Sequence, residues 1–209
     1  MPTHSVIPPT DLRCEYLIDP LGIDKTHPRL SWIDPPTPDA RGQYQTAYQV
    51  LVASSAEALG ADDGDLWDSG KVASDRNVNV AYEGKTLAGG QACWWKVRWW
   101  DGDDASEYSY TATFEMGLLE QKDWQGEWIA ADAGVSSPLL RKTLHLEGKP
   151  GRARIYVCGL GYYELYVNGE KVGDSVLDPG TTYYHNDQPF PLNARVLYVT
   201  YDVTDRLVE

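Results

Sequence analysis

Residues 154–184 read RIYVCGLGYYELYVNGEKVGDSVLDPGTTYY, and this stretch decides the structural class of the second half of the chain. Asn168 and Gly169 stand between two runs of alternating polar and apolar residues. An Asn-Gly pair supplies the two positive φ angles that a two-residue type I′ turn requires. The stretch therefore predicts a β-hairpin.

The two faces of the incoming arm of this hairpin differ in chemistry, as expected where one face of a sheet is buried. One face carries the side chains of Tyr163, Leu165 and Val167, which we expect in the core. The other carries two phenol rings and a carboxylate, from Tyr162, Glu164 and Tyr166. That combination could stack on a sugar and hydrogen-bond to it. Tyrosine is also a favourable strand residue with a polar tip, so both interpretations stay open.

The composition limits the classes of protein to which the hairpin can belong. The 209 residues suffice for one large domain or two ordinary ones. Asp and Glu number 31 against 18 Lys and Arg, and no basic cluster interrupts the formal charge of −13. We therefore expect neither nucleic acid nor an anionic membrane as a partner. The abundance of Trp (8) and Tyr (14) over Phe (2) and Met (2) favours β-sheets.

The cysteines and the start of the chain bear on where the protein is located. Cys14, Cys93 and Cys158 are too few and too scattered for a disulfide framework, and we expect them to be small buried hydrophobic residues. The first residues lack the basic start and apolar run of a secretory signal, and no 18 apolar residues follow one another. We expect a cytoplasmic protein.

The first half of the chain predicts six or seven short strands at regular spacing. A strand at 29–32 carries Trp32 inward, and the other candidates are 45–54 (central), 66–72, 77–82, 93–101 and 109–117. This number and spacing predict a β-sandwich of the immunoglobulin or fibronectin type III kind. The only helical candidate, residues 54–60, is short, with Ser54 and Glu57 as its capping pair.

We divide the chain into an arm (1–11), a sandwich (12–117), a linker (118–123) and a second β domain (124–209). Within the second domain, we expect residues 124–132 to form an edge strand, with its two tryptophans packed across the joint between the domains. Further β-structure is expected at residues 138–148, 151–161 and 195–207. The sequence thus predicts an all-β protein.

Oxygen-rich loops are the candidates for metal binding, because calcium takes six to eight oxygen ligands. Two acidic loops lack the EF-hand spacing and are more simply explained as solvated loop tips. The first contains Asp62, Asp63 and Asp65, and the second contains Asp101, Asp103 and Asp104. The loop after the hairpin combines the possible calcium ligands Asp178, Asn186 and Asp187 with the possible sugar-stacking residues Tyr183 and Tyr184. An ordinary solvated turn would explain the same residues.

No catalytic residue is predicted. The four histidines are scattered, and neither His-Glu-x-x-His nor Gly-x-Ser-x-Gly occurs. A glycosidase needs two suitably spaced carboxyl groups, and among 31 acidic residues the sequence does not single out a pair.

Eight segments in order resemble the N-terminal portion of bacterial α-L-rhamnosidases of glycoside hydrolase family 78. They are LRCEYLIDPLGIDKTHPRLSW, QTAYQVLVASS, LWDSGKV, WKVRWWD, FEMGLLEQKDWQGEWI, LLRKTLHLEG, GLGYYELYVNGEKVGDSVLDPGTTYY and YDVTDRL. The resemblance implies an immunoglobulin-like or fibronectin-like sandwich followed by a jelly roll like a carbohydrate-binding module, which in some members binds L-rhamnose with calcium. It also implies an inverting glycoside hydrolase whose acid and base lie on an α/α barrel farther along.

This chain departs from the family pattern in two places. Residues 185–194 are longer and richer in proline than the corresponding stretch, and the jelly roll would normally continue beyond residue 209. We therefore expect a truncated second domain whose exposed sheet edge promotes association or poor solubility. The main hypothesis is a non-catalytic N-terminal region that presents rhamnosides to a downstream barrel, with no cofactor required and calcium possible. The alternatives are a stand-alone carbohydrate-binding or scaffold protein and a domain like those at the front of β-galactosidase-type enzymes.

Overall fold

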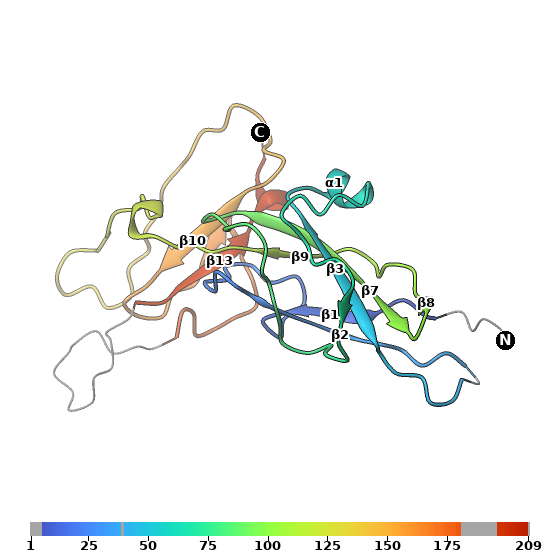
Figure 1. The fold of residues 1–209 in the computed structure, drawn as a ribbon. Coiled ribbons are helices and arrows are strands. Elements are labelled where there is room, and N and C mark those ends of the chain that lie inside the picture. Colours follow the sequence, from blue (N-terminus) through green and yellow to red (C-terminus); the bar gives the residue numbers. More distant parts are fainter. Residues whose placement is uncertain (1–5, 39, 181–195, 209) are drawn as a thin grey trace. The chain divides into compact units, whose positions relative to one another are not determined.

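The computed structural model describes residues 6–38, 40–180 and 196–208, and the chain divides into two compact units. The first unit is Met1–Trp124 and the second is Gln125–Glu209. Almost all regular structure is β, as predicted (Figure 1).

The first unit contains a three-stranded antiparallel sheet in the order β1-β2-β6, of which β1 and β2 are labelled in Figure 1. Its strands are β1 (Thr10–Cys14), β2 (Arg29–Ile33) and β6 (Val80–Ala81). Trp32 of β2 is buried, which confirms the inward orientation predicted for it. Only two residues of the run at 77–82 form a strand.

A second, six-stranded sheet is built around two long strands, β3 (Ala47–Ala53) and β7 (Ala92–Asp101). These pair antiparallel over seven residues, from Ala47 opposite Trp100 to Ala53 opposite Trp94, so the central position predicted for β3 is confirmed. The shorter strands are β4 (Trp67–Asp68), β5 (Val72–Ala73), β8 (Asp104–Ala105) and β9 (Ala112–Glu115). The single strand expected at 66–72 is divided between β4 and β5, around a positive φ of 61° at Gly70.

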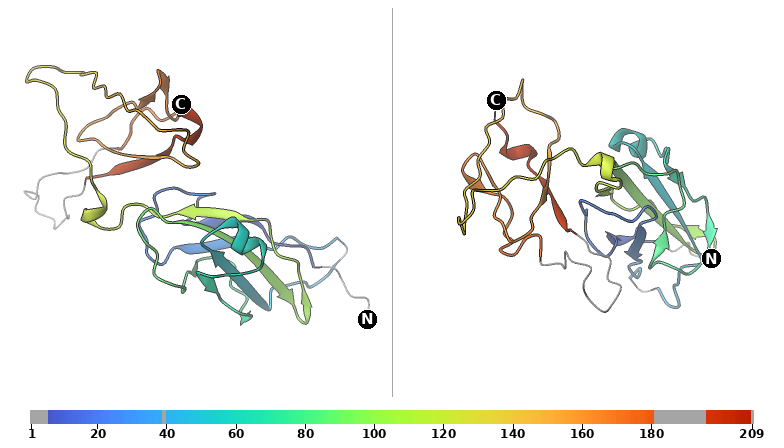
Figure 2. Two further views of the ribbon diagram at one scale, coloured as in Figure 1. Left: turned by 90° about the horizontal axis from the view of Figure 1, so that it is seen from above. Right: turned by 90° about the vertical axis from the view of Figure 1, so that its left-hand side faces the viewer.

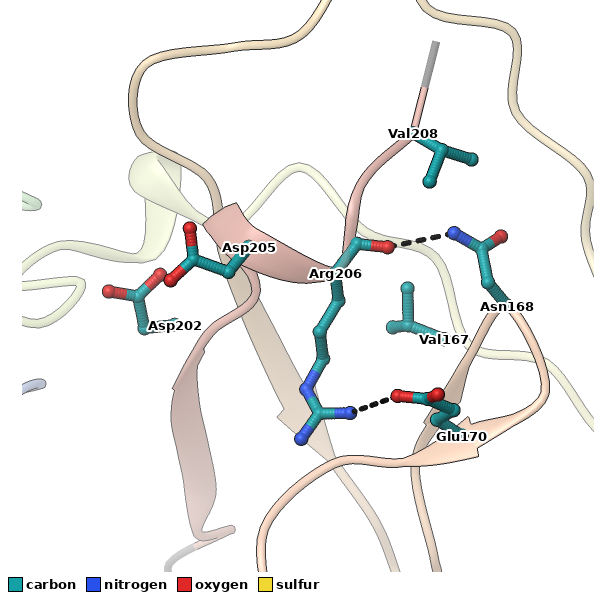
Figure 3. A pocket seen from close by; sticks show the side chains of 7 residues that line it. All are labelled: Val167, Asn168, Glu170, Asp202, Asp205, Arg206 and Val208. Carbon is teal, nitrogen blue, oxygen red and sulfur yellow. Dashed lines mark hydrogen bonds and ion pairs between the residues drawn. The ribbon is translucent and has the colours of Figure 1, made fainter.

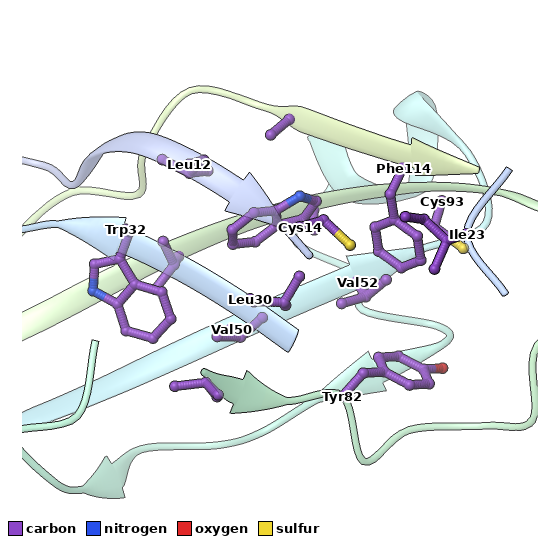
Figure 4. Packing of buried hydrophobic residues seen from close by; sticks show 14 of the residues in the cluster. Leu12, Cys14, Ile23, Leu30, Trp32, Val50, Val52, Tyr82, Cys93 and Phe114 are labelled. Carbon is purple, nitrogen blue, oxygen red and sulfur yellow. The ribbon is translucent and has the colours of Figure 1, made fainter. Parts of the chain in front are cut away.

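The two sheets of the first unit lie in two layers (Figure 2), and side chains from both meet in one hydrophobic core (Figure 4), which makes this unit a sandwich. Leu12, Cys14, Leu30 and Trp32 come from the smaller sheet. The larger sheet contributes Val50, Val52, Cys93, Trp95 and Phe114. This arrangement follows from alternation along the longer strands, which turn apolar side chains toward the facing sheet.

A short helix covers part of the outer face of the large sheet. The helix α1 (Ala56–Gly60) packs Leu59 against Leu51 and Ala53 of β3. Its N-cap is Ser55, whose hydroxyl accepts a hydrogen bond from Ala58 N at 3.1 Å. The capping role predicted for Ser54 is wrong, because the Ser54 hydroxyl instead donates to Asp65 Oδ2 at 2.7 Å.

The second unit contains two small antiparallel ladders. In the first, β10 (Arg154–Cys158) pairs with β13 (Tyr198–Asp202). In the second, β11 (Tyr166–Val167) pairs with β12 (Glu170–Lys171). Two 3-10 turns complete the regular structure of the described residues, η1 (Gln121–Asp123) at the end of the first unit and η2 (Thr204–Arg206) after β13.

Two strand predictions for the second domain are wrong. Residues 124–132 and 138–148 form no strand, and their apolar side chains are largely exposed, with Trp128 at 66% and Leu139 at 100%. The β-forming residues are present, but a strand persists only where a neighbouring strand accepts its hydrogen bonds, and these segments pair with no described strand. Cys158 is half-buried, whereas Cys14 and Cys93 are buried as predicted.

Within the described ranges, no helix is long and apolar enough to cross a membrane.

Candidate functional site

The predicted hairpin is present, and its turn has the predicted geometry. Asn168 has a φ of 52° and Gly169 a φ of 87°, the two positive angles of a type I′ turn. Tyr166 lies opposite Lys171, and Val172 N donates to Leu165 O at 2.8 Å to extend the pairing. The regular ladder is shorter than the sequence suggested, with two residues on each strand.

The faces of the incoming arm alternate as predicted. Tyr163, Leu165 and Val167 are half-buried, whereas Tyr162, Glu164 and Tyr166 are exposed. Tyr162 is 58% exposed and Tyr166 54% exposed, so both rings can be reached from solvent.

Glu164 is the centre of a polar cluster on the exposed face. Its Oε1 accepts a hydrogen bond from Lys171 Nζ at 2.8 Å, and its Oε2 accepts one from the Tyr166 hydroxyl at 2.9 Å. The Lys171 ammonium, followed by the Tyr166 hydroxyl, lowers the pKa of the Glu164 carboxyl. Glu164 is therefore an ionised acceptor that is already hydrogen-bonded to the Tyr166 hydroxyl.

The inner side of the hairpin is linked to Asp178. Tyr163 N donates to Asp178 O at 3.1 Å, and the hydroxyls of Tyr163 and Tyr201 lie 3.2 Å apart. The Tyr201 hydroxyl donates in turn to Asp178 Oδ2. Burial, reinforced by this bond to Asp178, raises the pKa of Tyr201. One carboxylate oxygen of Asp178 is thus already used as an internal acceptor.

The predicted calcium site can be examined only in part. Asp178 is the one proposed ligand in the described region, since Asn186 and Asp187, together with Tyr183 and Tyr184, lie outside the described residues. Among the residues whose placement is described, no three His, Cys, Asp or Glu side chains are grouped so as to hold a metal ion. Of the acidic loops, Asp62 pairs with Lys96 and Asp65 accepts hydrogen bonds from Ser54.

Sequence reasoning missed a groove on the other side of the hairpin turn (Figure 3). It has a volume of about 590 Å³ and is lined by Val167, Asn168, Glu170, Asp202, Asp205, Arg206 and Val208. Asn168 Nδ2 donates to Arg206 O at 2.8 Å, and Arg206 Nη1 lies 3.4 Å from Glu170 Oε2. Asp202 and Asp205 lie on the opposite side of the arginine (Figure 3). The groove exists because η2 folds back beside the turn, which no local pattern reveals.

The fold places the chain among all-β proteins with an immunoglobulin-like first domain, and its second unit carries an exposed aromatic hairpin. Residues 9–120 match a family model described as the Rha78A-like N-terminal immunoglobulin domain, and residues 148–209 match one described as the α-L-rhamnosidase N-terminal domain. The chain belongs to the α-L-rhamnosidase family and corresponds to its N-terminal region, as the sequence resemblance predicted.

Individual relatives agree with this assignment. An α-L-rhamnosidase of Formosa agariphila is 34% identical over 90% of this chain, and one of an Alteromonas species is 36% identical over 97%. The α-L-rhamnosidase structure from Dictyoglumus thermophilum is 40% identical and superposes with a TM-score of 0.85 over 97% of the chain. A Streptomyces avermitilis α-L-rhamnosidase complexed with L-rhamnose is 31% identical, with a TM-score of 0.57 over 96%.

The chain spans a small part of each of these relatives. It covers 22% of the Formosa protein, 23% of the Alteromonas protein, 24% of the Dictyoglumus chain and 21% of the Streptomyces chain.

Proposed function

We propose that this chain is a non-catalytic module of an α-L-rhamnosidase and that it presents rhamnose-containing carbohydrate to a downstream catalytic domain. The observation that carries the proposal is the pair of matches along the chain, both to N-terminal domains of this family. The size of the relatives, which are several times longer, leaves room for a separate domain that hydrolyses terminal α-L-rhamnosides.

The exposed face of the hairpin is the proposed contact surface for the sugar. Sugars present apolar C–H faces that stack on aromatic rings and hydroxyls that donate to carboxylates. Tyr162 and Tyr166 supply accessible rings, and Glu164 supplies an ionised acceptor between them in sequence. Tyr183 and Tyr184 belong to the same proposal, as does a calcium ion held by Asp178, Asn186 and Asp187. The calcium ligand of Asp178 would be Oδ1, since Oδ2 already accepts a hydrogen bond from the Tyr201 hydroxyl.

Isothermal titration calorimetry with L-rhamnose tests the proposed contact surface. We expect saturable heat from the wild-type chain and a loss of roughly thirtyfold in affinity for the double variant Tyr162→Ala, Tyr166→Ala, because stacking on each of the two rings contributes about 1 kcal/mol. Repeating the titration with EDTA separates a calcium-dependent site from a calcium-independent one.

A matched control is Tyr44→Ala, which removes a tyrosine that is 66% exposed in the first unit. The control should bind rhamnose like the wild type. Absence of heat with and without calcium would refute sugar binding, and release of p-nitrophenol from p-nitrophenyl rhamnoside by this chain alone would refute the non-catalytic assignment.

A further inference from the structure

The turn of the hairpin holds the one Asn-Gly pair of the sequence in an accessible position. Asn168 and Gly169 are both exposed, and a Cβ added at Gly169 would meet no atom within 4 Å. In such a pair the backbone nitrogen of the glycine can attack the side-chain amide carbon of the asparagine, because a glycine carries no side chain that obstructs the approach. The turn therefore presents the groups that intramolecular deamidation requires.

The reaction needs only water. The Gly169 nitrogen loses its proton to solvent and bonds to Asn168 Cγ, and Nδ2 takes up a proton and leaves as ammonia, which closes a five-membered succinimide ring. Water then opens the ring at either carbonyl. Opening at Cγ gives aspartate, and opening at the backbone carbonyl gives isoaspartate, whose main chain runs through Cβ. Water is consumed and ammonia released, with no change in oxidation state.

The hairpin around this pair is short and poorly buried. Its regular ladder has two residues on each strand, and none of these four residues is buried. A two-stranded hairpin is marginally stable by itself, and segments with few buried contacts open at a low cost in free energy. Local opening lets the Asn168 side chain rotate toward the Gly169 nitrogen.

The amide group that the reaction would remove links the turn to η2 (Figure 3). Asn168 Nδ2 donates to Arg206 O at 2.8 Å. The second described link is the ion pair between Arg206 Nη1 and Glu170 Oε2, which is longer, at 3.4 Å, and involves a glutamate side chain that is 80% exposed. The Asn168 amide is the shorter of these two links across the groove.

A carboxylate at position 168 would act against this arrangement. It has no hydrogen to donate, and it would face the carbonyl oxygen of Arg206. The guanidinium of Arg206 points toward Glu170 instead (Figure 3). Asp202 and Asp205 line the same groove, so the added charge would also be repelled by existing negative charge.

We propose that Asn168 is a deamidation site and that its conversion releases η2 from the hairpin turn, which opens the groove between them. Aspartate preserves the turn, because Asp-Gly also suits a type I′ turn, so its effect is the loss of the link to Arg206. Isoaspartate goes further, since its additional main-chain carbon does not fit a two-residue turn. Sugar binding by the hairpin is not required for this reaction.

Peptide mass spectrometry of the whole chain, after incubation at mildly alkaline pH, tests the modification. We expect Asn168 to gain the mass difference between NH2 and OH, and an isoaspartate assay to detect the second product. Asn77 and Asn79 are internal controls that should stay unchanged, because each precedes a valine whose branched side chain obstructs the attack. Asn168→Gln should stop the conversion, since glutamine would have to close a larger ring.

An unmodified Asn168 would overturn the proposal if the same chain, unfolded in urea, converts under the same conditions. Equal conversion of Asn77 or Asn79 would also overturn it.

Hydrogen exchange in Asn168→Asp tests the consequence for η2. The reporter is Arg206 N, which donates to Val203 O at 3.0 Å. Its exchange should become about fivefold faster, the effect of losing one ordinary hydrogen bond. The matched control is Asn79→Asp, which adds the same charge at an exposed asparagine with a positive φ of 55° in the first unit. Unchanged or slower exchange at Arg206 in Asn168→Asp, or an equal change in Asn79→Asp, would overturn the proposed release.

Discussion

At the scale of single residues, Lys96 is a buried cation with a structural role. Its Nζ donates to Leu59 O at 2.7 Å at the end of α1 and pairs with Asp62. It also lies 4.8 Å from the centre of the Tyr108 ring. The lysine thus joins β7 to the end of the helix, through a carbonyl that also accepts a hydrogen bond from Asp62 N at 3.1 Å.

Lys96→Met should lower the free energy of unfolding by about 1–2 kcal/mol. Methionine keeps the apolar stem but removes the charged hydrogen bond to the Leu59 carbonyl and the ion pair with Asp62. Urea denaturation followed by tryptophan fluorescence measures the loss. Lys122→Met is the control, because Lys122 is 74% exposed and a solvent-exposed pair such as the one with Glu120 contributes little to stability. Equal effects of the two substitutions would contradict the role given to Lys96.

Asp34 makes stability depend on pH in a direction opposite to that of most carboxylates. Its pKa in the folded chain, about 6, lies above the usual value of 3.8, so the folded state binds more protons than the unfolded state between these values. Its contribution to stability is therefore greatest below about pH 4 and is lost as the pH rises through 6.

Asp34→Asn should remove this dependence and stabilise the chain at pH 7.5. A shift of two pKa units corresponds to about 3 kcal/mol, and solvent screening of a part-buried group reduces the expected gain to about 1 kcal/mol. Urea denaturation of both proteins at pH 4.5 and 7.5 gives the difference. A variant that is less stable than the wild type at pH 7.5 would contradict this account.

At the scale of elements, the hairpin shows which structural features the local sequence determines. Its turn and the alternation of its faces follow from Asn168, Gly169 and the period of two, and the structure confirms both. The sequence predicts the N-cap of α1 one residue too early, because two adjacent serines, Ser54 and Ser55, are equally good candidates for it. Only the position of Asp65, brought near by the chain leading to β4, decides which hydroxyl is free to cap.

Gly169→Ala should destabilise the second unit by about 1 kcal/mol. An L-residue with a side chain is strained at the φ of 87° found there. Hydrogen exchange at Val172 N, which donates to Leu165 O, would report the loosened hairpin. Gly151→Ala, at a glycine of the same unit with open space around it and no positive φ, should have little effect. Unchanged exchange at Val172 in Gly169→Ala would argue against a strained turn.

At the scale of the molecule, the two units differ in the quality of their cores. The first unit buries Trp32, Trp95, Trp99 and Phe114 almost completely. Among the described residues of the second unit, only Val172 and Val203 are buried hydrophobic residues. Trp128, Ile129, Leu139 and Leu144 are instead more than 60% exposed. Hydrophobic burial is the main stabilising contribution, so the units should differ in stability.

Native-state hydrogen exchange should therefore show strong protection in β3 and β7 and weak protection in β10 and β13. The same exposed apolar residues should cause concentration-dependent association, measurable by sedimentation. Equal protection of all four strands would contradict the difference in core quality, and a strictly monomeric chain would contradict the predicted association.

The sequence by itself determined the all-β class, the sandwich of the first unit, the hairpin turn and the family. These features depend on local periodicity and turn chemistry, or on ordered motifs along the chain. Only the tertiary structure decided that residues 124–132 and 138–148 form no strands, that η2 closes a groove beside the hairpin turn, and that Asp34 lies part-buried without a cation. Each depends on which distant segments pair or pack together, and sequence periodicity specifies which face a residue occupies but not which neighbour it meets.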